Sequence, residues 1–250
     1  PRHRLAVREL SVVPPGHDRP TLTDVSFQLE AGMGLALVGP SGSGKSTLAR
    51  ALVGVWPAAA GAVQLDGRSL AQWRQDDLGG HLGYLPQDVA LLDGTIAMNI
   101  ARFSPAIDPK AVAEAAVLAG VHDTILRLPE GYHTRAAGGR GMLSVGQLQR
   151  IGLARAIYGR PFLVVLDEPN AHQDSEGELA LGETISTLRS RGSIVIVVSH
   201  RPSAIARLDM ALVLAAGRLV SFGPKQSVAL ALASSFQEKP SVGQPRQGRR

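Results

Sequence analysis

The chain has 250 residues, enough for one large α/β domain or two small ones. It contains no cysteine, which excludes disulfide bonds and thiolate metal sites, and no apolar stretch approaches the roughly 18 residues that a membrane-spanning helix needs. Its net charge of +5 comes from basic residues spread along the chain, which favours a solvated surface, or contact with an anionic membrane, over a nucleic-acid-binding patch.

The first part of the chain predicts short strands around one glycine-rich loop. Residues 5–13 and 21–29 have strand patterns, and apolar and polar side chains alternate clearly in the second. The apolar run 35–38 predicts a buried strand, and residues 48–53 predict a helix. A further strand over residues 62–65 ends at a turn, so we expect an antiparallel element beside the loop.

The loop between the buried strand and the helix carries the pattern G-x-x-x-x-G-K-[ST]. Its residues are Gly39, Pro40, Ser41, Gly42, Ser43, Gly44, Lys45, Ser46 and Thr47. Glycines let backbone N–H groups point at an anion, and the helix N-terminus adds further donors. Lys45 can reach the β- and γ-phosphates, and the Ser46 hydroxyl can bind Mg²⁺. A Gly/Ser surface loop is the alternative, but the strand–loop–helix context favours a nucleoside triphosphate site.

The rest of the chain predicts helices and then a parallel sheet. A strand over residues 82–85 precedes several helical patterns, so we expect one domain over residues 1–250 with a helical subdomain at about 90–158. Nearly continuous apolar runs at 162–166 and 194–198 flank a predicted helix and indicate parallel strands covered by helices. A hairpin closes the fold, and the polar sequence from about 237 predicts a flexible tail.

Polar side chains follow three of the predicted buried strands. They are Gln87, the pair Asp167 and Glu168, and His200. Ligands bind at the carboxyl ends of parallel strands, so we expect these side chains near the glycine-rich loop. Asp167 can orient Mg²⁺ or its waters, Glu168 can accept a proton from an attacking water, and His200 can donate to a γ-phosphate. An acidic turn and an ordinary loop histidine are the alternatives, and Gln87 alone carries no signal.

Residues 143–147 open a predicted helix that runs to residue 158. Ser144 and Gln147 have the S-x-x-Q spacing of a capping box, which by itself explains both residues structurally. A capped helix N-terminus beside Gly146 is also a second anion-binding end. One nucleotide needs only one phosphate loop, so a second end of this kind makes sense when it meets the nucleotide of another copy.

In this order the motifs resemble the nucleotide-binding domain of ABC transporters, over roughly residues 5–232. The resemblance identifies Walker A at 39–47, the Q-loop glutamine at Gln87, the signature sequence at 143–147, Walker B at 162–168 and the switch histidine at His200. It implies an α/β fold of the P-loop NTPase class and ABC type. Such a fold has a mostly parallel core sheet, an antiparallel β subdomain and a helical subdomain.

The resemblance also implies a head-to-tail homodimer that binds ATP and Mg²⁺. ATP would lie between Walker A of one copy and Ser144, Gly146 and Gln147 of the other. In this resemblance Glu168 is the general base and His200 senses the γ-phosphate. Ser46 and Gln87 are the magnesium ligands, and Asp167 is the carboxylate that lies behind them. Closing on ATP and reopening after hydrolysis would drive attached membrane domains.

Finer features resemble one branch of the family. Residues 93–100 and the pair Gly131-Tyr132 resemble exporters fused to membrane spans, while 52–57, 84–89 and 167–170 resemble ATPases of type I secretion systems. This branch implies a transmembrane domain in the same full-length chain, and it implies an ATPase domain on the cytoplasmic face of the bacterial inner membrane. A periplasmic adaptor and an outer-membrane channel would be further partners, and nucleic acid would not. The missing initiator Met favours a piece of a longer polypeptide.

Four positions depart from the family pattern. Val145 replaces a glycine of the signature, and because a β-branched residue does not easily take positive φ, we expect a changed approach of the γ-phosphate. The D-loop reads 171-AHQD-174 in place of Ser-Ala-Leu-Asp, which affects communication between sites. Residues 137–138 lack the usual Gly-Glu carboxylate that contacts coupling loops. Residues 12–15 lack the aromatic ring that stacks on adenine, so base contact would be aliphatic.

Other classes of protein compete with the exporter. A stand-alone ATPase subunit that docks on separate membrane proteins would carry the same motifs. A soluble ABC-type protein that acts on nucleic acid or ribosomes would fit the positive charge, but coiled-coil arms or a second ATPase domain do not fit in 250 residues. A P-loop kinase would leave the signature segment and His200 without a role.

Overall fold

The computed structural model describes residues 1–136, 143–169, 175–199 and 201–229. Its strands are β1 (Arg4–Val12), β2 (Leu22–Glu30), β3 (Gly34–Val38), β4 (Ala60–Leu65), β5 (Arg68–Ser69), β6 (Leu82–Leu85), β7 (Leu163–Asp167), β8 (Ile194–Val198), β9 (Met210–Ala215) and β10 (Arg218–Pro224). Its helices are α1 (Lys45–Leu52), η1 (Leu70–Gln72), α2 (Gln75–His81), α3 (Ile96–Ile100), α4 (Pro109–Leu118), α5 (His122–Leu126), η2 (Gly131–His133), α6 (Val145–Ile157), α7 (Ser175–Ser190) and α8 (Pro202–Ala206).

The larger sheet has six strands in the order β10-β9-β3-β8-β7-β6. The five strands from β9 to β6 run parallel, and β10 pairs antiparallel with β9. Strands β7 and β8 are buried at every residue because other elements cover both faces of the sheet. The prediction of a parallel sheet is confirmed. Its strands share one carboxyl edge, where the loops after β3, β6, β7 and β8 meet.

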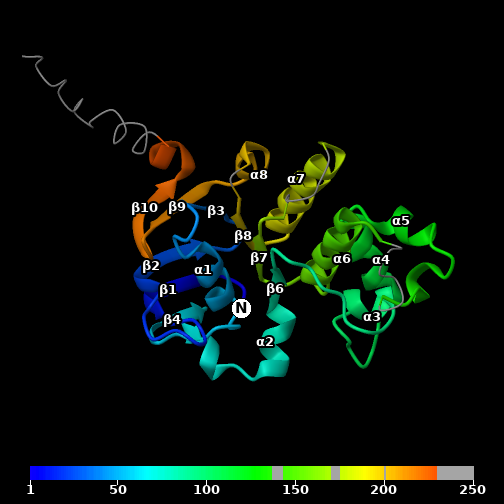
Figure 1. The fold of residues 1–250 in the computed structure, drawn as a ribbon, viewed down its shortest axis with the longest axis horizontal. Helices are drawn as coiled ribbons and strands as arrows, with labels where there is room; N and C mark the ends of the chain where they lie inside the picture. Colours follow the sequence, from blue (N-terminus) through cyan, green and yellow to red (C-terminus); the bar gives the residue numbers. More distant parts are fainter. Residues whose placement is uncertain (137–142, 170–174, 200, 230–250) are drawn as a thin grey trace, which may run out of the picture.

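The smaller sheet is antiparallel and has the order β2-β1-β4-β5. Leu5 of β1 pairs with Leu29 of β2 on one side and with Leu65 of β4 on the other. This confirms the predicted antiparallel element. It lies on one side of the molecule, whereas α3, α4, α5 and α6 group on the opposite side (Figure 1).

Several short elements were not predicted from the sequence: α2, β5, α8 and the turns η1 and η2. Helix α2 includes Gly79 and Gly80 and buries no side chain, so neither helix propensity nor apolar periodicity marks it. Strand β5 has 2 residues, too few for an alternating pattern. Both elements follow from the position of the chain between β4 and β6.

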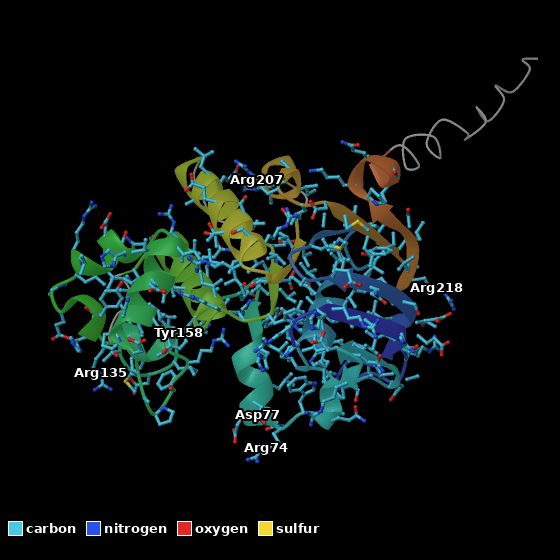
Figure 2. The ribbon with its side chains drawn as sticks, turned by 180° about the vertical axis from the view of Figure 1, so that it is seen from behind. Arg74, Asp77, Arg135, Tyr158, Arg207 and Arg218 are labelled. Atoms are coloured by element: carbon cyan, nitrogen blue, oxygen red, sulfur yellow. The ribbon has the colours of Figure 1, made fainter. Side chains whose placement is uncertain are left out.

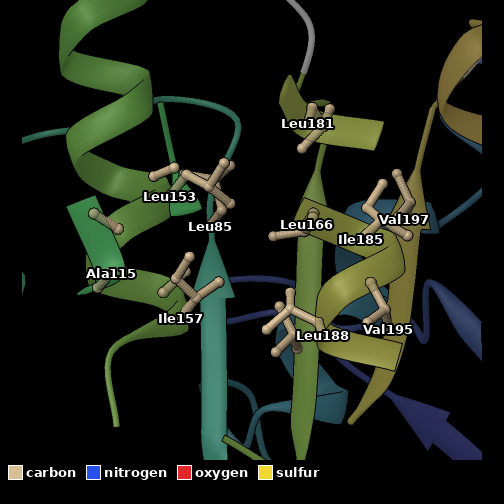
Figure 3. Close-up of a cluster of buried hydrophobic side chains, with 14 of the residues drawn as sticks. Leu85, Ala115, Leu153, Ile157, Leu166, Leu181, Ile185, Leu188, Val195 and Val197 are labelled. Atoms are coloured by element: carbon tan, nitrogen blue, oxygen red, sulfur yellow. The ribbon is translucent and has the colours of Figure 1, made fainter. Parts of the chain in front are cut away.

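Two apolar clusters cover the two faces of the larger sheet. On one face Leu166 and Val197 lie with Ile185 of α7, and Leu85 lies with Leu153 of α6 (Figure 3). On the other face the sheet packs against α1 and the smaller sheet. Because successive residues of a strand face opposite sides, each buried strand contributes to both clusters. This packing fixes the carboxyl edge of the sheet against α1 and α6.

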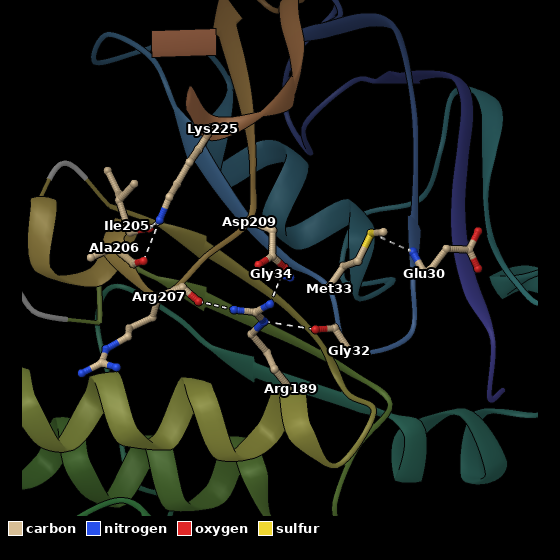
Figure 4. A network of polar contacts seen from close by, with 10 residues as sticks. All are labelled: Glu30, Gly32, Met33, Gly34, Arg189, Ile205, Ala206, Arg207, Asp209 and Lys225. Atoms are coloured by element: carbon tan, nitrogen blue, oxygen red, sulfur yellow. Dashed lines mark hydrogen bonds and ion pairs between the residues drawn. The ribbon is translucent and has the colours of Figure 1, made fainter. Parts of the chain in front are cut away.

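A polar network holds the last turn of α7 against the starts of β3 and β9 (Figure 4). Arg189 donates from Nε to the Gly32 carbonyl at 3.1 Å and forms an ion pair with Asp209. Lys225 donates to the Ala206 carbonyl at 2.6 Å. The network lies at the amino ends of β3 and β9, opposite the edge that carries the motifs.

The surface charges of the described residues are dispersed. Arg74, Arg135, Arg207 and Arg218 lie at separate edges of the molecule (Figure 2). In the part of the chain that the structure describes, no helix is long and apolar enough to cross a membrane. The predicted tail from about residue 237 lies outside the described residues.

Candidate phosphate-binding site

The glycine-rich loop after β3 has a backbone that requires glycine. Gly39 and Gly44 have φ angles of +152° and +99°, which side chains rarely allow. A Cβ on Gly39 would lie 2.2 Å from the Leu214 carbonyl oxygen, and a Cβ on Gly44 would lie 2.7 Å from a methyl group of Leu22. The loop is therefore tightly seated between β9 and β2, with its backbone fixed in a curve.

Lys45 closes this curve from inside. Its buried side chain donates from Nζ to the carbonyls of Gly39 and Pro40, both at 2.8 Å. Helix α1 begins at Lys45, and its N-cap residue is Gly44, which has no side chain that could accept a hydrogen bond from the first turn. The first N–H groups of α1 therefore remain available to an anion, beside a lysine ammonium. This arrangement fits a phosphate group.

Asp167 ends β7 and is 1% exposed. Neither of its carboxylate oxygens has a well-formed hydrogen bond among the described residues. Burial raises the pKa of Asp167; the Ser46 hydroxyl lowers it, Glu168 raises it, and the charges of Arg50 and Lys45 lower it. A buried carboxylate that faces Ser46 and whose oxygens lack a well-formed hydrogen bond fits a Mg²⁺ ion or the waters of that ion.

Glu168 follows Asp167 in a strained backbone conformation, with φ at +50°. Its N–H donates to the Val198 carbonyl at 2.9 Å. Its side chain accepts a hydrogen bond from Gln87 Nε2 at 3.2 Å, so the structure brings these two predicted site residues together. Because β6 and β7 are neighbours in the sheet, Gln87 and Glu168 leave it at adjacent points.

The sequence did not reveal a third partner of Glu168. Gln149, on α6, donates from Nε2 to the Glu168 carbonyl at 3.1 Å. The side chain of Gln149 is 2% exposed. Its only sequence signal is a polar residue at a buried position of an otherwise apolar helix face, a pattern too common to identify a site.

The predicted capping box at the start of α6 is confirmed. Ser144 Oγ accepts from the Gln147 N–H at 3.2 Å, and Gln147 Oε1 accepts from the Ser144 N–H at 2.8 Å. Val145 is 58% exposed and is the first residue of the helix, without a positive φ. The premise that this position needs a positive φ is therefore wrong, because the position is helical; a changed approach of the γ-phosphate stays a prediction. No hydrogen bond between described residues joins Ser144 or Gln147 to the glycine-rich loop.

Several predicted features lie outside the described residues. They are His200, the D-loop at 171–174 and the pair at 137–138. In the region predicted to face adenine, Val12 and Pro14 are buried, and residues 12–15 contain no aromatic ring. An aliphatic contact to the base stays a prediction.

A cavity of about 930 Å³ lies away from the glycine-rich loop, between α1, β4, α2 and β6. It is lined by Trp56, Trp73, Arg102 and Arg155, among others, and by none of the residues 39–47. Arg102 donates to five backbone carbonyls at the ends of α2 and α6. Burial, together with the charge of Arg155, lowers the pKa of Arg102 to about 10.

Comparisons with known proteins agree on one family. Residues 22–171 match the family described as ABC transporter. The chain is 55% identical over 228 residues to the type I secretion system ATP-binding protein PrsD of Rhizobium meliloti, covering 91% of this chain and 39% of that protein. It is 37% identical over 211 residues to an ATP-dependent lipid A-core flippase of Saccharophagus degradans, covering 84% of this chain and 36% of that protein.

A solved structure agrees with these matches. A bacterial Atm1-family ABC exporter with ATP bound is 32% identical to the chain and superimposes with a TM-score of 0.82. The match covers 97% of this chain and 43% of that one. The chain therefore spans less than half the length of each of these relatives.

Proposed function

The chain belongs to the ABC transporter family, and on this premise we propose that it is the ATP-hydrolysing domain of an exporter for type I protein secretion. The 55% identity to a type I secretion ATP-binding protein supports this branch, against 37% to the lipid A-core flippase. A stand-alone ATPase subunit that docks on separate membrane proteins is the alternative. We propose that residues 1–250 act as one ATPase domain.

The observation that carries the proposal is the seating of the glycine-rich loop beside Asp167. The loop would bind the phosphates of ATP through its N–H groups, and Lys45 would exchange its two carbonyl partners for phosphate oxygens. Ser46 and Gln87 would bind Mg²⁺, with Asp167 holding a water of the ion. A bound Mg²⁺ would neutralise charge on the β- and γ-phosphates.

Glu168 would be the general base that takes a proton from the attacking water. Its side chain accepts a hydrogen bond from Gln87, which supports a carboxylate held in a fixed direction. His200 would contact the γ-phosphate. The departing γ-phosphate would remove the contacts that hold the ATP-bound state together.

The phosphate loop would form half of a complete site. Residues 39–47 do not line the cavity described above, and Ser144 and Val145 are exposed at the start of α6. We propose that Ser144, Gly146 and Gln147 of one copy complete the site of a second copy in a head-to-tail dimer. A transmembrane domain in the same chain would place this dimer on the cytoplasmic face of the inner membrane, with a periplasmic adaptor and an outer-membrane channel as further partners.

Glu168→Gln tests the proposed chemistry. The variant keeps the hydrogen-bonding shape of the side chain but cannot accept the proton, so we expect normal ATP binding and a loss of turnover of at least about a hundredfold. The ATP-bound dimer should also persist longer. Hydrolysis at the parental rate would show that Glu168 is not the base.

The branch within the family has a separate test. The coding sequence upstream of residue 1 should continue in frame and encode about six apolar spans of roughly 20 residues each. A start codon immediately before residue 1 would favour the stand-alone subunit.

A further inference from the structure

Gln149 is a buried residue of α6 whose side-chain amide contacts the backbone of Glu168, the proposed general base. Its Nε2 donates to the Glu168 carbonyl at 3.1 Å, and 2% of the side chain is exposed. Its Oε1 has no hydrogen-bond partner among the residues that the structure describes. An unpartnered buried oxygen costs stability, so packing alone does not explain a glutamine here.

The conformation of Glu168 depends on bonds from three different elements. Its N–H is bound to Val198 of β8, its carbonyl to Gln149 of α6, and its side chain to Gln87 after β6. With φ at +50°, a residue that is not glycine needs such surrounding contacts to keep its conformation. Removing the bond from α6 would release the peptide that follows Glu168 and let the carboxylate change direction.

Helix α6 connects this bond to the surface that would face the second copy. Ser144 caps the helix, and Gln149 lies little more than one turn further on, about 7.5 Å along the axis at roughly 1.5 Å per residue. A hydrogen-bonded helix moves as one body over this distance. A phosphate bound at the Ser144 end therefore displaces or fixes Gln149 together with Ser144.

We propose that Gln149 is a positioning residue, through which α6 orients Glu168 according to whether the Ser144 end of the same helix holds the γ-phosphate of the second copy's ATP. Each copy would then hydrolyse its own ATP efficiently only when the opposite site is filled. This inference rests on the proposed function, because it takes Glu168 as the base and Ser144 as a contact to the second copy. It supplies a route between the two sites that does not use residues 171–174.

Gln149→Met, introduced into the full-length protein, tests the inference. Methionine has a similar length, keeps the packing and removes both the donor and the unpartnered oxygen. We expect kcat to fall by about tenfold to a hundredfold, with KM for ATP and the Kd of ATP binding within about twofold of the parent. The dependence of the rate on ATP concentration should lose cooperativity, with a Hill coefficient close to 1. The unfolding temperature should stay the same or rise.

Ser193→Ala is a matched control. Ser193 is buried and donates from Oγ to the Pro161 carbonyl at 2.8 Å, a bond of the same kind at the opposite end of β7 and β8. Its loss should lower the unfolding temperature without changing kcat, KM or the Hill coefficient. Gln149→Leu removes the same donor with a different shape and should reproduce the kinetic result of Gln149→Met.

Two results would overturn the inference. The first is a kcat and Hill coefficient of Gln149→Met that match the parent, and the second is a fall in kcat only in parallel with a fall in unfolding temperature. The double variant with Glu168→Gln should turn over no more slowly than Glu168→Gln alone, because Gln149 acts through Glu168. Full turnover by Glu168→Gln alone would refute the proposed base, whereas loss of turnover there with a normal Gln149→Met refutes only the positioning role.

Discussion

Arg102→Lys should lower the stability of the protein through the loss of hydrogen bonds at two helix ends. The Arg102 guanidinium donates to Gly79 and Leu82 around the end of α2, and to Arg155, Ala156 and Tyr158 at the end of α6, over 2.7–3.2 Å. These carbonyls have no partner within their helices, so the arginine satisfies two C-termini at once.

The size of the effect follows from the donors that lysine retains. An ammonium group has three donors at a single point, so at least two of the five bonds are lost. Each hydrogen bond to a charged group contributes about 1.5–3 kcal/mol, and Arg102 is only half-buried, so the lower value gives about 3 kcal/mol in total. For a chain of this size the unfolding temperature should then fall by roughly 6–12 °C.

Thermal unfolding followed by circular dichroism measures this change. Arg135→Lys is the matched control, because the Arg135–Asp93 ion pair at 3.1 Å is exposed on both sides and should contribute about 0–1 kcal/mol. A shift for Arg102→Lys no larger than that of Arg135→Lys would refute the reasoning. The five bonds would then be replaced by water at no cost, and Arg102 would not hold the two helix ends.

Two further predictions concern the phosphate-binding site. Asp167→Asn should raise the unfolding temperature of the nucleotide-free protein at neutral pH. Burial raises the folded-state pKa of Asp167 above 3.8, so stability is lost as pH rises through that raised value. The same variant should lose stabilisation by ATP with Mg²⁺, and thermal unfolding with and without that ligand checks both effects. Gly39→Ala should weaken ATP binding by more than about tenfold, since its Cβ would lie 2.2 Å from the Leu214 carbonyl oxygen. In Gly42→Ala the added Cβ meets nothing within 4 Å, so this variant should weaken binding less. Equal affinities of the two variants in fluorescent-nucleotide titrations would contradict this.

Local sequence patterns predicted the elements whose cause is local. The apolar runs of β7 and β8, the capping box of Ser144 and Gln147, and the glycine-rich loop all follow from neighbouring residues. The expectation about Val145 rested on a premise that proved wrong for a related reason. A glycine in a family pattern was taken to require positive φ, but the residue stands in the first turn of a helix, where valine fits.

The amino-acid sequence by itself determined the family, the phosphate loop and the strand-end carboxylates, because each depends on residues close together in the chain. Only the tertiary structure decided which of these groups meet. The neighbouring positions of β6, β7 and β8 in the sheet bring Gln87 and Val198 to Glu168, and the packing of α6 beside them brings Gln149. Strand order and helix packing depend on the whole buried surface, so no local pattern encodes them. The strained Glu168 is therefore visible only in the folded chain.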